Sequence, residues 1–328
     1  MAKVLVTGAN GFLGSNLVRR LNQEGHHVRI LVRSTSDLSE LDGCQFEKFV
    51  GDVTDVESLR KAVVGIETVF HLAGVIAYRR ADRSLMEKVN VGGTANLLTA
   101  LQGSGVSRLV DLSSVVAIGA GFRPDQILNE ESEYNVGSLH LGYFDTKHQA
   151  EMLVRQACVE KKVDAVILNP STIYGAGDAL KGTRKTQVKV AQGKFPFYTR
   201  GGVNIIHVDD CVEGILSAWK KGRTGERYIL SGENLLLKDV FDMIAQEAGV
   251  ASPKMQMPSW ALFTLGWVGD RMTDVGMKGP VSTENAWTSQ MYHWFDNAKA
   301  RRELGLDPRP ARVALHDSVN WMKEKGIL

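Results

Sequence analysis

Two residues of this chain, Tyr143 and Lys147, have the types and the spacing to transfer a proton. Residues four apart on a helix share one face, so both side chains can act on the same bound molecule. A free phenol has a pKa of about 10, and a neighbouring ammonium group stabilises the phenolate and lowers that pKa. Such a tyrosine can exchange a proton with a substrate oxygen. The spacing is also common on exposed helices, so the surrounding elements must decide between the two interpretations.

Short apolar segments alternate with amphipathic ones through the first half of the chain. This alternation predicts an α/β fold, a doubly wound parallel sheet with helices on both faces. Right-handed crossovers place the carboxyl ends of the strands at one edge of the sheet, where ligands of such folds bind. Strands are predicted at residues 4–7, 28–32, 46–50, 68–72, 108–112 and 165–168, and helices at residues 14–23, 56–63, 87–101 and 143–159.

The alternation ends at Pro170. The next segment is rich in Gly, Lys and Thr, which predicts an irregular insertion. Two more strands, at residues 204–208 and 228–231, flank a helix that Asp209 is placed to cap, and the pattern from residue 235 onward is helical. We therefore predict a dinucleotide-binding domain of residues 1–170, completed by about residues 203–231, and a smaller, discontinuous substrate-binding domain of residues 171–202 and 232–328.

The composition argues against several classes of protein. Charged residues make up 23% of the chain and the net charge is +2, so no nucleic-acid partner is expected. The cysteines Cys44, Cys158 and Cys211 have no Cys-x-x-Cys spacing, which argues against a zinc site and a disulfide framework. No metal is expected. A strand-like segment begins at Lys3 and leaves no room for a signal peptide, so a cytoplasmic location is expected.

The longest apolar segment, residues 260–268, is too short to span a bilayer. We interpret it as a packed helix of the substrate-binding domain, so contact with a membrane is not expected. Trp260 and Trp267 are the residues that keep the membrane interpretation open.

A glycine turn, residues 8–14, follows the first predicted strand and opens the first predicted helix. Its G-x-x-G-x-x-G spacing differs slightly from the G-x-G-x-x-G dinucleotide fingerprint. The physical reason is the same, because small residues let the backbone approach a pyrophosphate held at the helix N-terminus. At the first strand–helix junction of such a fold, this turn predicts a bound dinucleotide.

The end of the second strand should contact the adenosine ribose, where an acid favours NAD and a cation favours NADP. Here the strand ends at Arg33, followed by Ser34 and Thr35, and the first acid is Asp37. The Arg33 guanidinium can form paired hydrogen bonds with a 2′-phosphate. We therefore expect NADP(H) as the preferred cofactor, with NAD(H) as the alternative and a solvated Arg33 as the competing interpretation.

Together these motifs resemble the extended short-chain dehydrogenase/reductase family, or NAD-dependent epimerase/dehydratase superfamily, over nearly the whole chain. The resemblance is greatest to the dihydroflavonol 4-reductase-like and hopanoid-associated sugar epimerase-like branch. It implies a Rossmann fold and assigns cofactor contacts to seven groups of residues. These are the glycine turn (Gly8, Asn10, Gly11, Phe12, Leu13 and Gly14), the ribose position (Arg33 and Ser34), the adenine segment (Asp52 and Val53), the turn after the fourth strand (Leu72, Ala73 and Gly74), the helix behind it (Asn90), the lysine of the Tyr-x-x-x-Lys pair (Lys147) and the nicotinamide segment (Asn169, Pro170 and Ser171).

The resemblance also implies a catalytic set. Tyr143 and Lys147 match the Tyr-x-x-x-Lys pair, and the family serine lies at the end of the fifth strand. Counting back from Gly119 places this serine at Ser114, with Ser113 as the alternative. In the family scheme the serine binds the carbonyl oxygen, and the tyrosine donates the proton as hydride reaches the carbon. The lysine lowers the tyrosine pKa and holds the nicotinamide ribose.

Three functions follow from these features. The first is an NADP-dependent oxidoreductase that reduces a ketone or aldehyde, or oxidises the alcohol. The second is a nucleotide-sugar epimerase or dehydratase with tightly bound cofactor, and the third is an NADP-binding sensor without catalysis. Phosphate groups in the second case could be held by Lys181, Arg184, Lys185, Lys189 and Arg200. We favour the first, with a small-molecule carbonyl or alcohol as substrate, and expect the homodimer that is frequent in the family.

Overall fold

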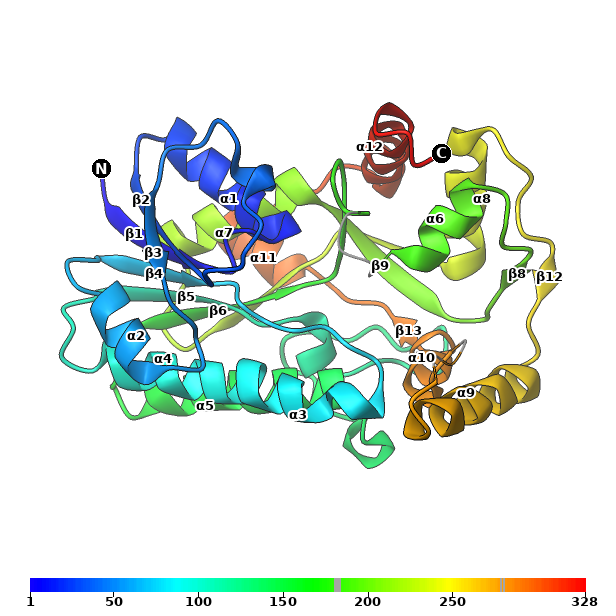
Figure 1. Ribbon diagram of the computed structural model, residues 1–328, viewed down its shortest axis with the longest axis horizontal. Coiled ribbons are helices and arrows are strands. Elements are labelled where there is room, and N and C mark those ends of the chain that lie inside the picture. Colours follow the sequence, from blue (N-terminus) through cyan, green and yellow to red (C-terminus); the bar gives the residue numbers. More distant parts are fainter. Residues whose placement is uncertain (180–183, 278, 280) are drawn as a thin grey trace.

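The main sheet consists of β1 (Lys3–Thr7), β2 (His27–Val32), β3 (Glu47–Val50), β4 (Thr68–His71), β5 (Arg108–Leu112), β6 (Ala165–Pro170) and β10 (Arg227–Leu230). These seven parallel strands lie in the order β10-β6-β5-β4-β1-β2-β3 (Figure 1). The computed structural model describes residues 1–179, 184–277, 279 and 281–328. The predicted doubly wound α/β fold is confirmed.

Helices cover both faces of the sheet because its side chains alternate between two apolar cores. Val4 and Val6 of β1 belong to one core and Leu5 belongs to the other. The first core is closed by α1 (Phe12–Gln23), α7 (Val208–Lys221) and α11 (Ala298–Leu304). The second is closed by α2 (Val56–Ala62), α4 (Gly93–Leu101) and α5 (Gly142–Val159).

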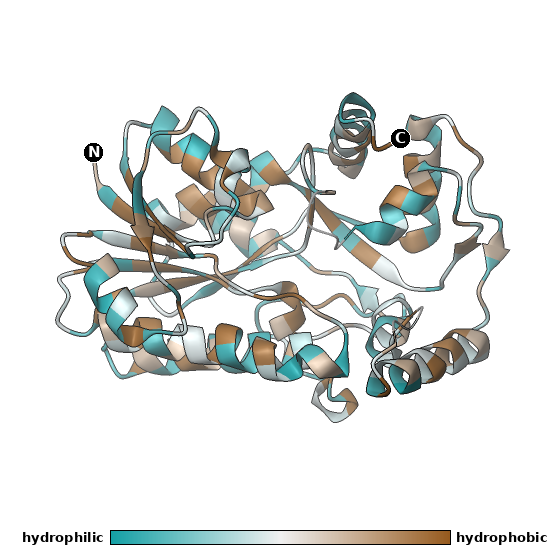
Figure 2. Ribbon diagram, viewed as in Figure 1, coloured by the Kyte–Doolittle hydropathy of each residue, from teal (hydrophilic) through white to brown (hydrophobic). Residues whose placement is uncertain are grey.

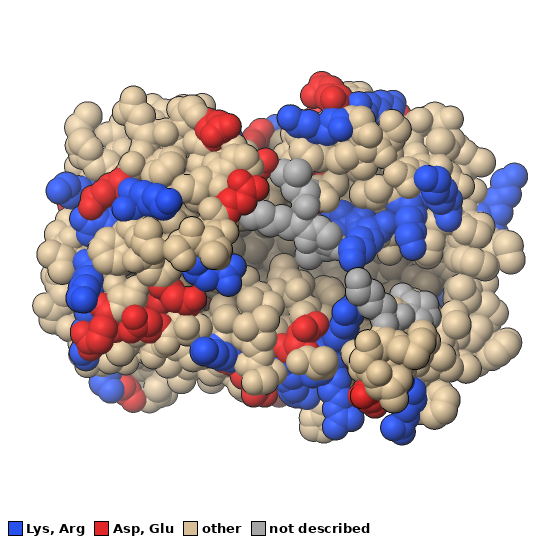
Figure 3. Space-filling view, viewed as in Figure 1, with Lys and Arg blue, Asp and Glu red and all other residues tan. Residues whose placement is uncertain are grey.

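A smaller half is built around β9 (Gly202–His207), which pairs with β7 (Thr172–Tyr174), β11 (Glu233–Leu236) and β13 (Tyr292–His293). It also contains α6 (Lys185–Ala191), α8 (Leu237–Ala248) and α12 (Ala311–Glu324), which share an apolar core with β9. Farther from the main sheet lie β8 (Phe197–Tyr198), β12 (Met255–Gln256), α9 (Ser259–Asp274) and α10 (Thr283–Thr288). Figure 3 shows a hollow between the two halves.

Three local expectations are corrected. The segment after Pro170 is less irregular than predicted, because it contains β7, α6 and β8. Helix α7 is capped by His207 rather than by Asp209. The Nδ1 atom of His207 accepts a hydrogen bond from the Asp209 amide at 3.1 Å. The predicted helix at residues 87–101 is divided into a π-helical turn, η3 (Glu87–Gly92), and α4; the short helix α3 (Arg83–Met86) precedes it.

The apolar segment 260–268 does form a helix of the smaller half, but it is not packed on all sides. Trp260 and Trp267 of α9 are 74% and 59% exposed. Figure 2 shows α9 as a largely apolar helix at the edge of the molecule. None of the helices in the described ranges is long and apolar enough to cross a membrane.

Candidate active site

The glycine turn forms a tight cradle between β1 and α1. Gly8 has a φ of 70°, and a Cβ atom on it would lie 2.7 Å from the backbone of Leu72. A Cβ atom on Gly14 would lie 2.2 Å from the carbonyl oxygen of Gly8. Gly11 precedes α1 without a side-chain cap, so the first amides of the helix, beginning with Phe12 and Leu13, are directed toward a ligand position. The cradle therefore fits a pyrophosphate held by backbone groups.

The predicted ribose position lies at the carboxyl end of β2, beside the glycine turn. The Asn10 side chain donates a hydrogen bond to the backbone carbonyl of Asp37 at 3.2 Å, which links the two loops. Arg33 and Ser34 are exposed. Among the described residues, the Arg33 side chain forms no ion pair or hydrogen bond, so its guanidinium can bind a phosphate group.

The adenine segment follows β3. The Asp52 carboxylate accepts a hydrogen bond from the Thr54 amide at 2.9 Å, and the Asp52 amide donates to the Ser58 hydroxyl at 3.1 Å. Val53 is buried, and its carbonyl accepts a hydrogen bond from Asn96 at 3.1 Å. These contacts fix the loop on the same sheet edge as the glycine turn and Arg33.

The turn after β4 is held by two side chains. The Thr7 hydroxyl accepts a hydrogen bond from the Ala73 amide at 3.1 Å. Asn90 contacts both backbone groups of Val75, with its oxygen 2.8 Å from the amide and its nitrogen 3.0 Å from the carbonyl. Its oxygen would also lie 3.4 Å from a Cβ atom on Gly74. Asn90 thus shapes the segment Leu72–Gly74 from behind, and the π-helical turn η3 positions Asn90 for these contacts.

Tyr143 and Ser114 meet at the carboxyl end of β5. Tyr143 lies in the first turn of α5 and is buried, and the Ser114 side chain lies beside its hydroxyl. Burial raises the pKa of Tyr143 well above its ordinary value, the nearby Tyr78 raises it further, and the Ser114 side chain acts in the opposite direction. The expected lowering of this pKa by Lys147 is not what the structure has, because burial dominates.

Lys147 lies one turn farther along α5. Its Nζ atom donates a hydrogen bond to the Leu112 carbonyl at 2.7 Å. Burial lowers the pKa of Lys147, and the carboxylates of Asp111 and Glu151 oppose this shift. The pKa of His71 is lowered to about 3, first by burial and then by the Lys147 charge. Lys147 is therefore the cationic centre of a buried cluster below the candidate site.

The segment after β6 completes the row of strand ends. Asn169, Pro170 and Ser171 are buried. The Ser171 hydroxyl and the Asn169 amide oxygen are buried without a hydrogen-bond partner among the described residues. Unpartnered buried polar atoms are costly in a folded protein. Both atoms thus fit the proposal that a polar group of a bound cofactor, such as the nicotinamide carboxamide, is accommodated here.

The family is shown by comparison with known proteins. The model of the "NAD dependent epimerase/dehydratase family" matches residues 4–231. The chain belongs to this family. A Synechocystis protein named "Putative dihydroflavonol 4-reductase" is 34% identical over 333 residues, covering 98% of this chain and 95% of that protein. "Sterol demethylase protein B" of Methylococcus capsulatus is 32% identical over 330 residues, covering 99% of both chains.

A solved structure agrees with this assignment. The protein gox2253 is similar over 100% of both chains, with a TM-score of 0.88 and 36% identity. The predicted membership of the extended short-chain dehydrogenase/reductase family, in a branch with dihydroflavonol reductase-like relatives, is confirmed. The chain is therefore an NAD(P)-dependent enzyme that acts on a small molecule.

This epimerase/dehydratase family member also contains a buried ion pair that the sequence interpretation missed. Glu151 and Arg227 are 2% and 9% exposed, and the Oε1 and Nη1 atoms lie 3.1 Å apart. The other oxygen of Glu151 accepts hydrogen bonds from Ser113 and Asn169, both at 2.6 Å. Asn169 also donates to the Ser114 carbonyl at 2.9 Å. Glu151 follows Lys147 by one helical turn, which is the signal that could have identified it.

This network bears on the two candidate serines. The Ser113 hydroxyl donates to Glu151, whereas Ser114 is the serine close enough to the Tyr143 hydroxyl to lower its pKa. The geometry therefore favours Ser114 over Ser113 as the serine beside the reacting group.

Tyr78 is a second site residue that the sequence interpretation missed. Its ring meets the Tyr143 ring edge to face, with 6.1 Å between centroids. Nearby, Trp287 packs in the same apolar cluster, and it contacts Phe263 of α9 with 4.9 Å between ring centroids. These aromatic side chains form an apolar wall beside Tyr143.

The basic residues considered for a phosphate site are separated in their roles. Arg184 stacks on the Tyr174 ring, 4.1 Å from its centroid, and donates a hydrogen bond to the Ile173 carbonyl. Lys185, Lys189 and Arg200 are exposed, and Lys181 lies outside the described residues. No group of three or more His, Cys, Asp or Glu side chains within the described ranges could hold a metal ion.

Proposed function

We propose that this enzyme is an NADP-dependent oxidoreductase that reduces a ketone or aldehyde, or oxidises the corresponding alcohol. The observation that carries the proposal is that the buried side chains of Ser114 and Tyr143 lie side by side, close to Lys147 and in the same row of strand ends as the glycine cradle. The name of the Synechocystis relative, a dihydroflavonol 4-reductase, supports a carbonyl substrate.

In this proposal the residues that would hold the cofactor follow the carboxyl ends of the strands. The glycine turn from Gly8 to Gly14 would hold its pyrophosphate, Arg33 and Ser34 would bind the ribose phosphate, and Asp52 and Val53 would contact the adenine. Asn169–Ser171 would accommodate its nicotinamide. When bound, NADPH supplies the hydride.

The chain's own residues supply the proton and the orientation. Ser114 donates a hydrogen bond to the carbonyl oxygen, and Tyr143 donates its proton to that oxygen as negative charge develops there. Because burial raises the pKa of Tyr143, the phenol is protonated at neutral pH and is ready to act as a donor. Lys147, one turn farther along α5, would hold the nicotinamide ribose of the bound cofactor.

The replacement Tyr143→Phe tests the mechanism. We expect NADPH consumption with a panel of ketones and aldehydes to fall at least about 100-fold, because the proton donor is lost while the ring remains. Fluorescence titration should show nearly unchanged NADPH binding. Tyr198→Phe is the matched control, since Tyr198 lies in β8 of the smaller half and is not assigned to the site.

Two results would contradict the proposal. An active Tyr143→Phe variant would exclude Tyr143 as the proton donor. Wild-type protein that purifies with non-exchanging nucleotide, and that consumes no added NADPH with any carbonyl, would instead indicate an epimerase or dehydratase.

Size-exclusion chromatography of the same protein tests the expected homodimer.

A further inference from the structure

The outer side of α9 carries an apolar surface that no part of the described chain covers. Trp260, Trp267 and Val268 are exposed by 74%, 59% and 38%, and Val275 and Met277, just after the helix, by 72% and 57%. We call these five residues the α9 face. Residues 255–269 contain no charged side chain. A helix that is apolar all round is normally buried on all sides, so this exposed side requires a partner.

The inner side of α9 is fixed, so the helix cannot rotate to bury its tryptophans. Gly266 and Gly269 allow close contact with the following segment. A Cβ atom on Gly266 would lie 3.0 Å from Thr283, and one on Gly269 would lie 1.9 Å from the Val281 carbonyl oxygen. The Thr283 amide also donates a hydrogen bond to Asp270 at 3.2 Å. Trp260 and Trp267 are seven residues apart and therefore share the opposite, outward side.

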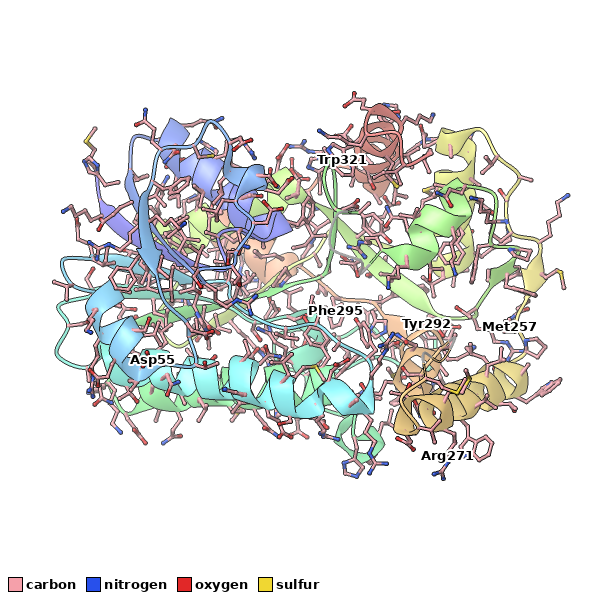
Figure 4. All side chains as sticks on the ribbon, in the orientation of Figure 1. Asp55, Met257, Arg271, Tyr292, Phe295 and Trp321 are labelled. Carbon is pink, nitrogen blue, oxygen red and sulfur yellow. The ribbon has the colours of Figure 1, made fainter. Side chains whose placement is uncertain are left out.

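Basic groups border this surface. Arg271 is on α9, with its guanidinium 5.6 Å from the centre of the Trp267 ring, and Figure 4 shows it at the outer edge of the helix. The Nη1 atom of Arg271 lies 3.8 Å from the Oδ2 atom of Asp274, and both side chains are mostly exposed. The turn η2 (Arg80–Asp82) packs against α9, and Arg79 and Arg80 are exposed. These arginines complement anionic groups around an apolar surface.

We propose that the α9 face docks this enzyme on the surface of a lipid bilayer containing anionic phospholipids. Tryptophan side chains are favoured where apolar chains meet polar headgroups, because the ring is apolar and the indole N–H is polar. The bordering arginines bind the anionic headgroups. A peripheral helix with one outward apolar side reaches only the boundary between headgroups and acyl chains, so no spanning segment is required. The proposal replaces the expectation that residues 260–268 are packed.

Helix α9 lies close to the candidate active site, so membrane docking would also affect the surroundings of that site. Phe263, on the inner side of the helix, contacts Trp287, which belongs to the same apolar cluster as Tyr143. Docking would thus place the apolar wall of the candidate site close to the lipid phase. This consequence rests on the proposed function, whereas the docking itself does not.

Vesicle flotation with the purified full-length protein tests the docking directly. We expect the wild type to float with vesicles of phosphatidylcholine and phosphatidylglycerol at 7:3, and less with phosphatidylcholine alone. The variant Trp260→Ser/Trp267→Ser should lose at least about tenfold in partitioning. Arg271→Gln should lose about fivefold, and only on the anionic vesicles. The control Val64→Ser/Val159→Ser replaces two apolar side chains of similar exposure, 66% and 77%, in the other half of the molecule and should float like the wild type.

The possible results distinguish membrane docking from loss of the fold and from self-association. Unchanged thermal unfolding of each variant shows that a loss of flotation is not a loss of fold. A wild type that does not float, or a tryptophan variant that floats equally well, would overturn the proposal. A wild-type oligomer that the tryptophan variant converts to monomer, without vesicle binding by either protein, would show that a second copy covers the α9 face. Flotation does not depend on catalysis, so its failure is distinct from failure of the proposed reaction.

Discussion

Glu151→Gln should strongly destabilise this enzyme, because it removes the charge that compensates the buried Arg227. Arg227 also donates to the carbonyls of Glu130 and Ser132, at 2.7 and 2.8 Å, so its guanidinium stays in place and charged. Removing one partner of a buried ion pair costs about 3–5 kcal/mol, since an uncompensated charge remains. Ser113 and Asn169 both donate hydrogen bonds to one carboxylate oxygen of Glu151, and the side-chain NH₂ group of glutamine cannot accept them.

This loss should be visible in thermal and urea unfolding. A cost of about 3–5 kcal/mol corresponds to a fall in Tm of roughly 4–7 °C for a chain of this size, because the unfolding entropy is about 2.1 cal/mol/K per residue. Tryptophan fluorescence can follow the transition, because the chain contains 6 tryptophans. Glu57→Gln is the matched control. Its partner Arg60 is on the same helix and both side chains are mostly exposed, so breaking this pair should change stability by less than about 1 kcal/mol.

A double replacement distinguishes the ion pair from simple loss of packing. Glu151→Leu/Arg227→Met removes both charges and retains apolar volume, so it should recover a substantial part of the stability lost in the single variant. The reasoning is refuted if Glu151→Gln costs no more than Glu57→Gln. It is also refuted if the double variant is as unstable as the sum of its two single replacements.

Three further predictions follow from the site. Arg33→Ala should weaken NADPH binding at least about tenfold and leave NADH binding unchanged; equal wild-type affinities for the two cofactors would contradict the assignment. Gly8→Ala should lose cofactor binding and stability, whereas Gly43→Ala, with a similar φ of 78° but open space around it, should cost only about 1 kcal/mol. Burial raises the pKa of Asp111 to about 7 from 3.8, so wild-type stability should fall as pH rises through that interval. Unfolding at several pH values should show Asp111→Asn gaining up to about 4 kcal/mol over the wild type above pH 7, with little gain near pH 4; a pH-independent difference would contradict it.

The sequence predicted the sheet and the order of its site segments because both follow from local patterns. Apolar strands alternate with amphipathic helices, and each motif directly follows a strand. The contacts from outside these motifs were not predictable in this way. Arg227 and Glu151 form their ion pair although they are 76 residues apart in the sequence. Tyr78 contacts Tyr143 from a loop that has no periodic pattern. The cap of α7 was also missed, because the His207 side chain folds back onto the helix start ahead of the acid that the capping rule favours.

The direction of the Tyr143 pKa shift bears on the direction of the reaction. A lowered pKa would favour alcohol oxidation, because the phenolate is the base that removes the hydroxyl proton. Burial raises this pKa instead, so the protein holds the phenol in its protonated form. Donating that proton to a developing alkoxide remains favourable, because an alkoxide is a much stronger base than a phenolate. A protonated Tyr143, together with an Arg33 side chain that has no partner among the described residues, therefore agrees with the proposed direction, which is carbonyl reduction with NADPH. A pH profile tests this argument: oxidation should rise steeply as pH increases toward the tyrosine pKa, whereas reduction should stay level from neutral to mildly alkaline pH.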